Sequence, residues 1–199
     1  MDAALALASI RGPQTLEVLK TNIFSFAGRS TSPENDYYLY KDARAAIDVH
    51  DQFKVVTYNA ANSVAFRACS VPMINRVAVP GLAAAGGVNL PNQNADMMVT
   101  GMLTACTLMY STNKMNLWCT HLEPARNTGV SDVGLKLGVD VVNTGGFAGT
   151  ADSVRAFTRR EYNSCHHANV FGVRRADGWT LYAQGVSPHG KIMFAVALN

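Results

Sequence analysis

The sequence predicts an α+β fold in which mixed β-sheets pack as a sandwich flanked by helices and loops. It contains about ten short segments rich in β-branched and aromatic residues, separated by turn-forming residues, and only a few segments with helical periodicity. With 199 residues, of which 48% are hydrophobic and 16% charged, the chain can bury a core. We therefore expect a single domain over residues 1–199.

The N-terminal part predicts two helices followed by strands. Asp2–Ile10 and Pro13–Lys20 each have an apolar face at helical spacing, and Gly12 with the proline after it separates them. The strands expected next are Asn22–Phe26, Tyr37–Lys41, Ala45–Val49, Phe53–Tyr58 and Val71–Val79.

The C-terminal part predicts one further helix and a hairpin. A helix is expected from about Thr150 to Asn163, since Val154 and Phe157 recur at helical spacing. The pair Asp177-Gly178, flanked by alternating residues, predicts a β-hairpin. The strands expected here are Leu135–Val142, Asn169–Arg175, Trp179–Gln184 and Lys191–Leu198.

Charge and cysteine usage narrow the class of protein. The net charge of +3 is small and the basic residues are scattered, so we expect no nucleic-acid partner. The four cysteines lack CxxC spacing, which favours free thiols in a reducing compartment. No apolar stretch reaches membrane-spanning length, and the opening residues lack the positive charge of a signal peptide. We expect a chain that folds in a cytosol and binds no membrane.

The segment Met97–Pro124 carries the candidate active site. Thr104–Tyr110 and Met115–Thr120 have the pattern of two strands joined by a polar turn, which predicts a β-hairpin. In such a hairpin Cys106 and His121 lie near the same end, as a cysteine nucleophile and its base require. Two alternatives stay open, because a cysteine in an apolar run is by default a core residue and a histidine beginning a loop is commonly a surface group.

The residues around this pair resemble a family of bacterial toxins. Thr100 is followed by Leu103-Thr104-Ala105-Cys106 and then by His121-Leu122-Glu123-Pro124. This pattern is similar to the catalytic domains of the Burkholderia lethal factor and cytotoxic necrotizing factor family. Those glutamine deamidases carry a threonine, a Leu-Ser-Gly-Cys motif and a histidine that closes the next strand.

The resemblance implies the same fold and a protein glutamine deamidase of the toxin or effector type. It implies Cys106 as nucleophile, His121 as the base whose imidazolium lowers the pKa of the thiol, and Thr100 as a residue that orients the histidine or the substrate. It also implies a host protein as substrate, a Rho-type GTPase or an RNA-helicase translation factor in the relatives. We expect a monomer without cofactor or metal ion, made in a bacterial cytoplasm without a cleavable signal and then secreted or delivered into a host cytosol.

The sequence departs from the family pattern at two positions. Thr104 and Ala105 stand where the family shows serine and glycine. Alanine is compatible with the family's geometry only if the backbone there needs neither a positive φ nor a very close approach of the substrate.

Other functions fit the same residues. The Cys/His pair also serves proteases and transglutaminases of other specificity. A non-enzymatic β-sandwich, such as a capsid or adhesion subunit, would suit the many short strands and the low charge. That alternative predicts a buried and unreactive Cys106, with Thr100 far from His121.

Two further groups of residues are weaker candidates. The run Cys165-His166-His167 suggests a metal site, but adjacent histidines in a strand point to opposite faces, so we expect no metal ion there. Cys119 lies two residues before His121 and shares its strand face, where we expect it to be a packed core residue.

Overall fold

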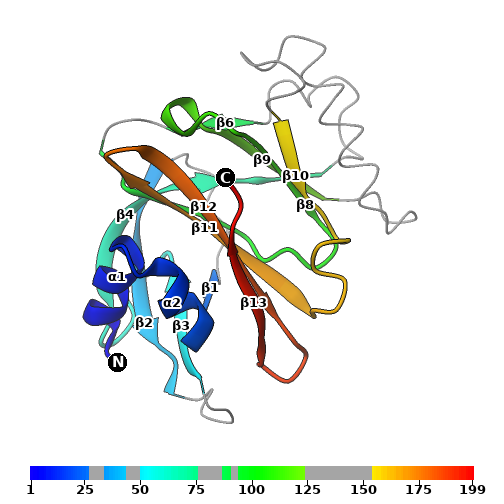
Figure 1. Cartoon of the computed structure of the whole chain (residues 1–199). Coiled ribbons are helices and arrows are strands. Elements are labelled where there is room, and N and C mark those ends of the chain that lie inside the picture. The colour runs from blue at the N-terminus through cyan, green and yellow to red at the C-terminus, as the bar shows by residue number, and fades with distance from the viewer. Residues whose placement is uncertain (27–33, 44–49, 76–86, 91–93, 124–153) are drawn as a thin grey trace.

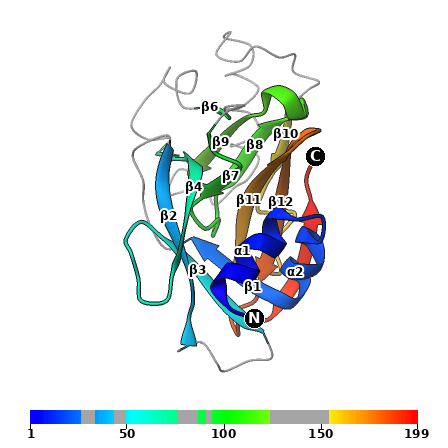
Figure 2. The same ribbon diagram turned by 90° about the vertical axis from the view of Figure 1, so that its left-hand side faces the viewer.

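The molecule consists of two β-sheets and two short helices (Figure 1). The structure, a computed structural model, describes residues 1–26, 34–43, 50–75, 87–90, 94–123 and 154–199. The helices and the smaller sheet lie at opposite ends of the molecule in both views (Figures 1 and 2). Within the described residues, no helix has the length and apolar character needed to cross a bilayer.

The helices α1 (Ala3–Arg11) and α2 (Thr15–Thr21) confirm the two expected near the N-terminus. The side chain of Asp2 caps α1 by accepting a hydrogen bond of 2.8 Å from the backbone N–H of Leu5. Ala6, Leu7 and Ile10 of α1 are buried together with residues of the larger sheet. Burial of these apolar faces therefore anchors both helices against the sheet.

The larger sheet has eight strands and mixed pairing. The pairs β1–β3 and β4–β7 are parallel, and the other neighbours are antiparallel. In spatial order the strands are β1 (Asn22–Phe26), β3 (Asp51–Val56), β2 (Glu34–Lys41), β4 (Val64–Val71), β7 (Met97–Thr100), β11 (His167–Arg175), β12 (Gly178–Val186) and β13 (Ile192–Ala197).

This sheet curls until its edge strand β1 comes back into contact with β11 and β12. We call this contact of β1 with β11 and β12 the seam of the sheet. The fully buried side chain of Gln184 on β12 bridges it. Its amide nitrogen donates to the carbonyls of Leu19 (2.5 Å) and Asn22 (2.7 Å), and its oxygen accepts from the N–H of Phe24 (3.1 Å). The larger sheet is therefore a nearly closed, barrel-like sheet.

The smaller sheet has five strands. Four of them follow the order β10 (Val154–Phe157), β8 (Thr107–Ser111), β9 (Trp118–Glu123) and β5 (Met73–Asn75), and β6 (Val88–Asn89) also pairs with β9. The pair β8–β9 is the hairpin expected in the candidate segment, with a 3-10 turn at Lys114–Asn116 in its connection.

Two parallel neighbours of the larger sheet continue directly into the smaller one. Strand β4 ends at Val71, paired with Thr100 at the end of β7. One residue after Val71 the chain enters β5, where Met73 pairs with His121. After Thr100 the chain crosses to β8, which begins at Thr107. The candidate residues therefore lie where the chain passes twice from one sheet to the other.

The described residues correct several expectations. The predicted mixed β-sheets and peripheral helices are present, but the larger sheet curls towards a barrel. Val154–Phe157 is a strand paired with β8, and turns follow it, so the helix predicted up to Asn163 is wrong where it can be compared. Val71 ends a strand that begins at Val64, which the sequence analysis missed. The expected strands Ala45–Val49 and Leu135–Val142 lie outside the described residues.

Replacement of Gln184 tests the seam. Gln184→Leu keeps the volume but leaves three buried backbone groups without their partner, so we expect a loss of about 2–4 kcal/mol in the free energy of unfolding. The measurement is urea unfolding followed by fluorescence. Gln14→Leu is the control, because Gln14 is exposed and its side chain makes no capping bond. Equal stability of the two variants would contradict the role of Gln184.

Candidate active site

His121 and Thr100 are joined by a buried hydrogen bond between the two sheets. His121 lies on β9 and Thr100 at the end of β7, and their side chains are 1% and 2% exposed. The Oγ1 of Thr100 is 2.8 Å from Nδ1 of His121 and 2.9 Å from the carbonyl oxygen of Val71. The residues that sequence alone separates by 21 positions are thus in direct contact.

These contacts decide which nitrogen of His121 carries the proton. The carbonyl of Val71 can only accept a hydrogen bond, so the single hydroxyl proton of Thr100 is directed to it. The Oγ1 of Thr100 must then accept from His121, which requires hydrogen on Nδ1. Nε2 is left with a lone pair, and within the described part of the chain it has no hydrogen-bond partner. The pair therefore holds His121 in the tautomer of a general base.

Burial keeps this imidazole neutral. Desolvation lowers the pKa of His121 from 6.5 to about 4, because the protonated ring would be charged in an apolar surrounding. A neutral ring with a bare Nε2 can accept a proton at neutral pH. A resting imidazolium beside the thiol is therefore not favoured, and we expect His121 to be charged only after it has taken a proton.

Cys106 falls, by the strand register, on the same face of the smaller sheet as His121. It immediately precedes β8, in which Leu108 pairs with His121, and Cys106 and Leu108 belong to one buried cluster between the sheets. The Sγ of Cys106 contacts Sδ of Met73 at 3.9 Å, and Met73 pairs with His121 from the other side. Cys106 is 5% exposed, whereas Met73 is 42% exposed. The thioether of Met73 thus covers the thiol.

Tyr162 holds the backbone of the cysteine. Its hydroxyl donates a hydrogen bond of 2.6 Å to the carbonyl of Cys106, and its ring stacks on Phe157. Burial raises the pKa of Tyr162, so the hydroxyl stays protonated and remains a donor at neutral pH. Sequence analysis placed Tyr162 on the face of a helix and gave it no role. Its contact spans 56 positions, and no local pattern signals it.

The connection from Thr100 to Cys106 is not an extended strand. After Thr100 the chain leaves the larger sheet, and Leu103 forms an isolated bridge with Ala168. Among the described residues, only two asparagines have a positive φ without being glycine, so Ala105 has an ordinary backbone conformation. The conformational objection to alanine at this position is therefore removed.

The other cysteines do not share this environment. Cys119 lies on the His121 face of β9, as expected, and is completely buried in the core. Burial raises the pKa of the Cys119 thiol and raises that of Cys69 to about 11, which keeps both protonated. None of the four cysteines forms a disulfide. Selective reactivity at neutral pH is therefore expected of Cys106 rather than of these two.

The side chains of the run Cys165-His166-His167 are oriented differently from the prediction. His166 and His167 do not point to opposite faces, because β11 begins only at His167, and their Nδ1 atoms are 3.1 Å apart. Cys165 instead lies in the core. Among the residues that the structure describes, no three histidine, cysteine or acidic side chains are arranged to hold a metal ion.

Comparison with models of known protein families finds no match, and comparison with curated protein sequences finds none either.

The first prediction for the site concerns Thr100. Thr100→Val removes the acceptor for Nδ1–H, so we expect His121 to lose its fixed tautomer and Cys106 to react with iodoacetamide at least about tenfold more slowly. Thr100→Ser keeps the hydroxyl and should restore both. ¹⁵N NMR of the imidazole reports the tautomer, and mass spectrometry reports the labelling. Wild-type behaviour of the valine variant would show that the hydrogen bond has no such effect.

The second prediction concerns pH. Since the pKa of His121 is about 4 when folded and 6.5 as an ordinary value, the unfolded chain binds more protons between these limits. Stability contributed by the neutral ring is complete above pH 6.5 and is lost as the pH falls to 4. Between these pH values we expect the free energy of unfolding to fall by about 3 kcal/mol more in wild type than in His121→Gln. Urea unfolding at several pH values measures this difference, and His50→Gln, at a half-buried position, is the control. Parallel curves for all three proteins would contradict the assignment.

Proposed function

We propose that the chain is a cysteine-dependent protein glutamine deamidase of the toxin or effector type, similar to the Burkholderia lethal factor and cytotoxic necrotizing factor family. The observation that carries the proposal is the bond from Nδ1 of His121 to Thr100, which leaves Nε2 as a base on the face that also holds Cys106. The motif that suggested the family supplies these three side chains.

The first half of the proposed reaction forms a thioester. Nε2 of His121 takes the proton of Cys106, and the thiolate attacks the carbon of a glutamine side-chain amide. The carbonyl electrons move onto oxygen, where backbone N–H groups near Cys106 stabilise the charge. The imidazolium then gives its proton to the amide nitrogen, the carbon–nitrogen bond breaks and ammonia leaves. Thr100 keeps the ring oriented through both proton transfers.

The second half regenerates the enzyme. Water attacks the thioester while His121 takes one of its protons, and the collapse of the adduct expels the Cys106 thiolate, which is protonated again by the imidazolium. The product is glutamate in place of glutamine. The target protein gains one negative charge with almost no change in shape, which can disable a catalytic glutamine or a charge-sensitive interface.

The proposed reaction requires that the side chain of Cys106 be brought to His121. Nε2 of His121 has no hydrogen-bond partner within the described residues, and the Sγ of Cys106 contacts Met73 instead. Substrate must therefore displace the thioether of Met73 and bring the thiol to the imidazole. Catalytic hydrogen bonds that tighten only when substrate binds are common in enzymes of this kind.

The main alternative is a non-enzymatic β-protein with a binding or structural role. It fits the burial of Cys106 and the apolar exposed strand β13, where Met193 and Val196 are 46% and 40% exposed. It does not account for the 2.8 Å contact between Thr100 and His121 or for a buried imidazole nitrogen without a partner among the described residues. Protease or transglutaminase activity at the same pair is the other alternative, and product analysis separates it from deamidation.

Thiol labelling decides whether the pair is an active site. We expect iodoacetamide to label Cys106 in the native protein and His121→Ala to lose that labelling. Met73→Ala should speed labelling several-fold because it uncovers Sγ, whereas Met115→Ala, an exposed methionine on the hairpin connection, should not. Labelling of Cys106 only after unfolding would make it a core residue and end the enzyme proposal.

Host-cell extract then tests the reaction. Wild type, but not Cys106→Ala, is expected to convert a glutamine of a folded protein to glutamate, detected by peptide mass spectrometry together with released ammonia. His121→Gln should lower the rate roughly a hundredfold or more, in the range of a lost general base. Peptide cleavage or amine incorporation by wild type would assign the pair to a protease or a transglutaminase.

A further inference from the structure

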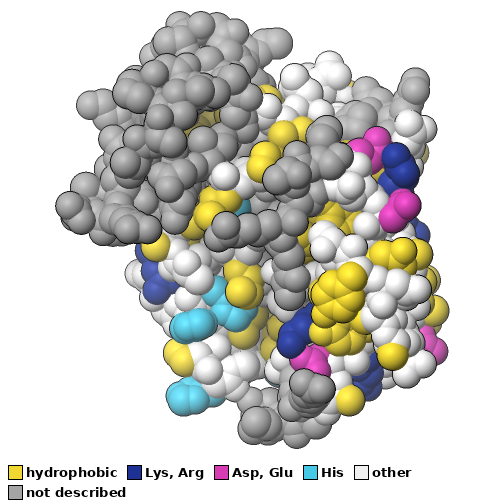
Figure 3. Space-filling model, turned by 180° about the vertical axis from the view of Figure 1, so that it is seen from behind, with side chains coloured by type: hydrophobic (Ala, Val, Ile, Leu, Met, Phe, Trp, Pro, Cys, Tyr) yellow, Lys and Arg dark blue, Asp and Glu magenta, His cyan; other side chains and the backbone are white. Residues whose placement is uncertain are grey.

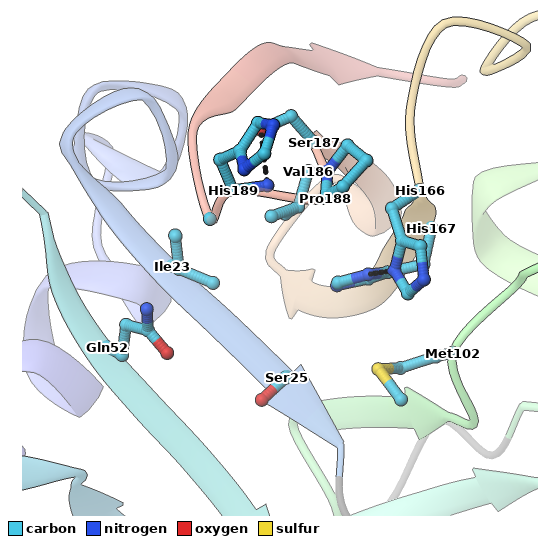
Figure 4. A pocket seen from close by; sticks show the side chains of 11 residues that line it. Ile23, Ser25, Gln52, Met102, His166, His167, Val186, Ser187, Pro188 and His189 are labelled. Atoms are coloured by element: carbon cyan, nitrogen blue, oxygen red, sulfur yellow. Dashed lines mark hydrogen bonds between the residues drawn. The ribbon is translucent and has the colours of Figure 1, made fainter. Parts of the chain in front are cut away.

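A second site candidate lies away from the Cys106 pair. A cavity of about 610 Å³ opens where the seam of the larger sheet meets the turn between β12 and β13 (Figure 4). Its volume is in the range of pockets that take small molecules or single side chains, about 300–1,000 Å³. Neither Cys106 nor His121 is among its lining residues. The polar side chains that line it come from distant parts of the chain and include Ser25, Gln52, His166, His167 and His189.

Two of these histidines form a bonded pair. The Nδ1 atoms of His166 and His167 are 3.1 Å apart and the rings meet at 83°. A hydrogen bond between two imidazole nitrogens needs one N–H and one lone pair, so the pair holds a single hydrogen between the rings. A further proton can be taken up by the Nε2 lone pair of the donor ring, which leaves the bond intact and gives the pair a positive charge. The protonated pair would therefore be stabilised by a negative group in the cavity.

The lining of the cavity is suited to a negative acceptor. The other lining residues that the structure describes are Ile23, Met102, Val186, Ser187, Pro188 and Gly190, so among the described residues the three histidines are the only titratable side chains of the lining. Histidine side chains gather on this face of the molecule (Figure 3). The hydroxyl of Ser25 and the amide of Gln52 add donors that carry no negative charge. Burial and the neighbouring His166 lower the pKa of His167, a cost that a bound anion would offset.

We propose that this cavity binds an oxyanion group, a carboxylate or a phosphate, between the protonated His166–His167 pair and His189. The ligand accepts hydrogen bonds from the Nε2–H groups of the charged pair and from the ring of His189. Each binding event takes up a proton, so affinity rises as the pH falls through the titration range of histidine. The inference concerns a separate site and does not depend on the deamidase proposal.

The cavity shares a wall with the connection that leads to Cys106. Met102 lines it, and the next residue, Leu103, exchanges two backbone hydrogen bonds of 2.8 Å with Ala168, which follows His167 directly. A β-carbon on Gly101 would lie 3.8 Å from Cε1 of His121, so the same connection also borders the imidazole. Occupancy of the cavity should therefore change the labelling rate of Cys106 through residues 101–106.

Titration of the whole chain with two probes tests the proposal. Sulfate represents a tetrahedral oxyanion and acetate a carboxylate, and neither changes protonation between about pH 6 and pH 8. We expect saturable shifts of the His166 and His167 imidazole signals in ¹⁵N NMR with at least one probe. The dissociation constant should weaken towards about tenfold per pH unit above the titration of the pair. The probe that binds more tightly indicates whether the natural group is a phosphate or a carboxylate.

Variants separate the pair from the rest of the surface. His166→Gln/His167→Gln should lose binding by at least about tenfold, and His189→Gln, in an exposed turn, should weaken it without affecting the fold. His50→Gln, outside the cavity, should bind as wild type does. Absence of saturable, pH-dependent binding to the wild-type chain overturns the proposal, as does unchanged binding by the double variant. So does a response of the two rings to zinc ions alone, which would make the pair a metal site.

Discussion

The arrangement of the candidate site depends on one chain of hydrogen bonds, from Nδ1 of His121 through the hydroxyl of Thr100 to the carbonyl of Val71. It joins β9 of the smaller sheet to the ends of β7 and β4 in the larger one. Because a hydroxyl has only one proton and a carbonyl has none to give, the chain has a single direction. The protonation of a buried histidine is thus set by backbone geometry, with no carboxylate among the described residues bonded to its ring.

A hydroxyl in this position has a different effect from an acid. A carboxylate beside Nδ1 would stabilise the imidazolium, whereas Thr100 orients the ring and burial keeps it neutral. In the proposed reaction His121 is a neutral base at rest and becomes charged only when it takes the proton of Cys106. Tyr162 holds the main chain of Cys106 at the same time, and the exposed side chain of Met73 contacts its thiol.

Sequence analysis predicted the helices, hairpins and turns that local sequence patterns determine. The helices before Asn22, the β8–β9 hairpin and the Asp177-Gly178 turn follow from periodicity and turn chemistry, and the turn glycine has a φ of +102°. The helix predicted for Val154–Phe157 is wrong. The spacing of its apolar residues also fits a helix, but the segment forms a strand that pairs with β8. The contacts of Tyr162 with Cys106 and of Thr100 with Val71 join distant segments, so spacing could not reveal them.

The crossing of two parallel strands from one sheet to the other has a consequence for folding. The ends of β4 and β7 pair only after a long loop between them has closed, and His121 reaches Thr100 only when the two sheets have docked. Contacts of this kind form late, because chain entropy opposes them until most of the core is in place. A chain that holds its hairpin and helices before the two sheets dock would therefore lack the bond that orients His121.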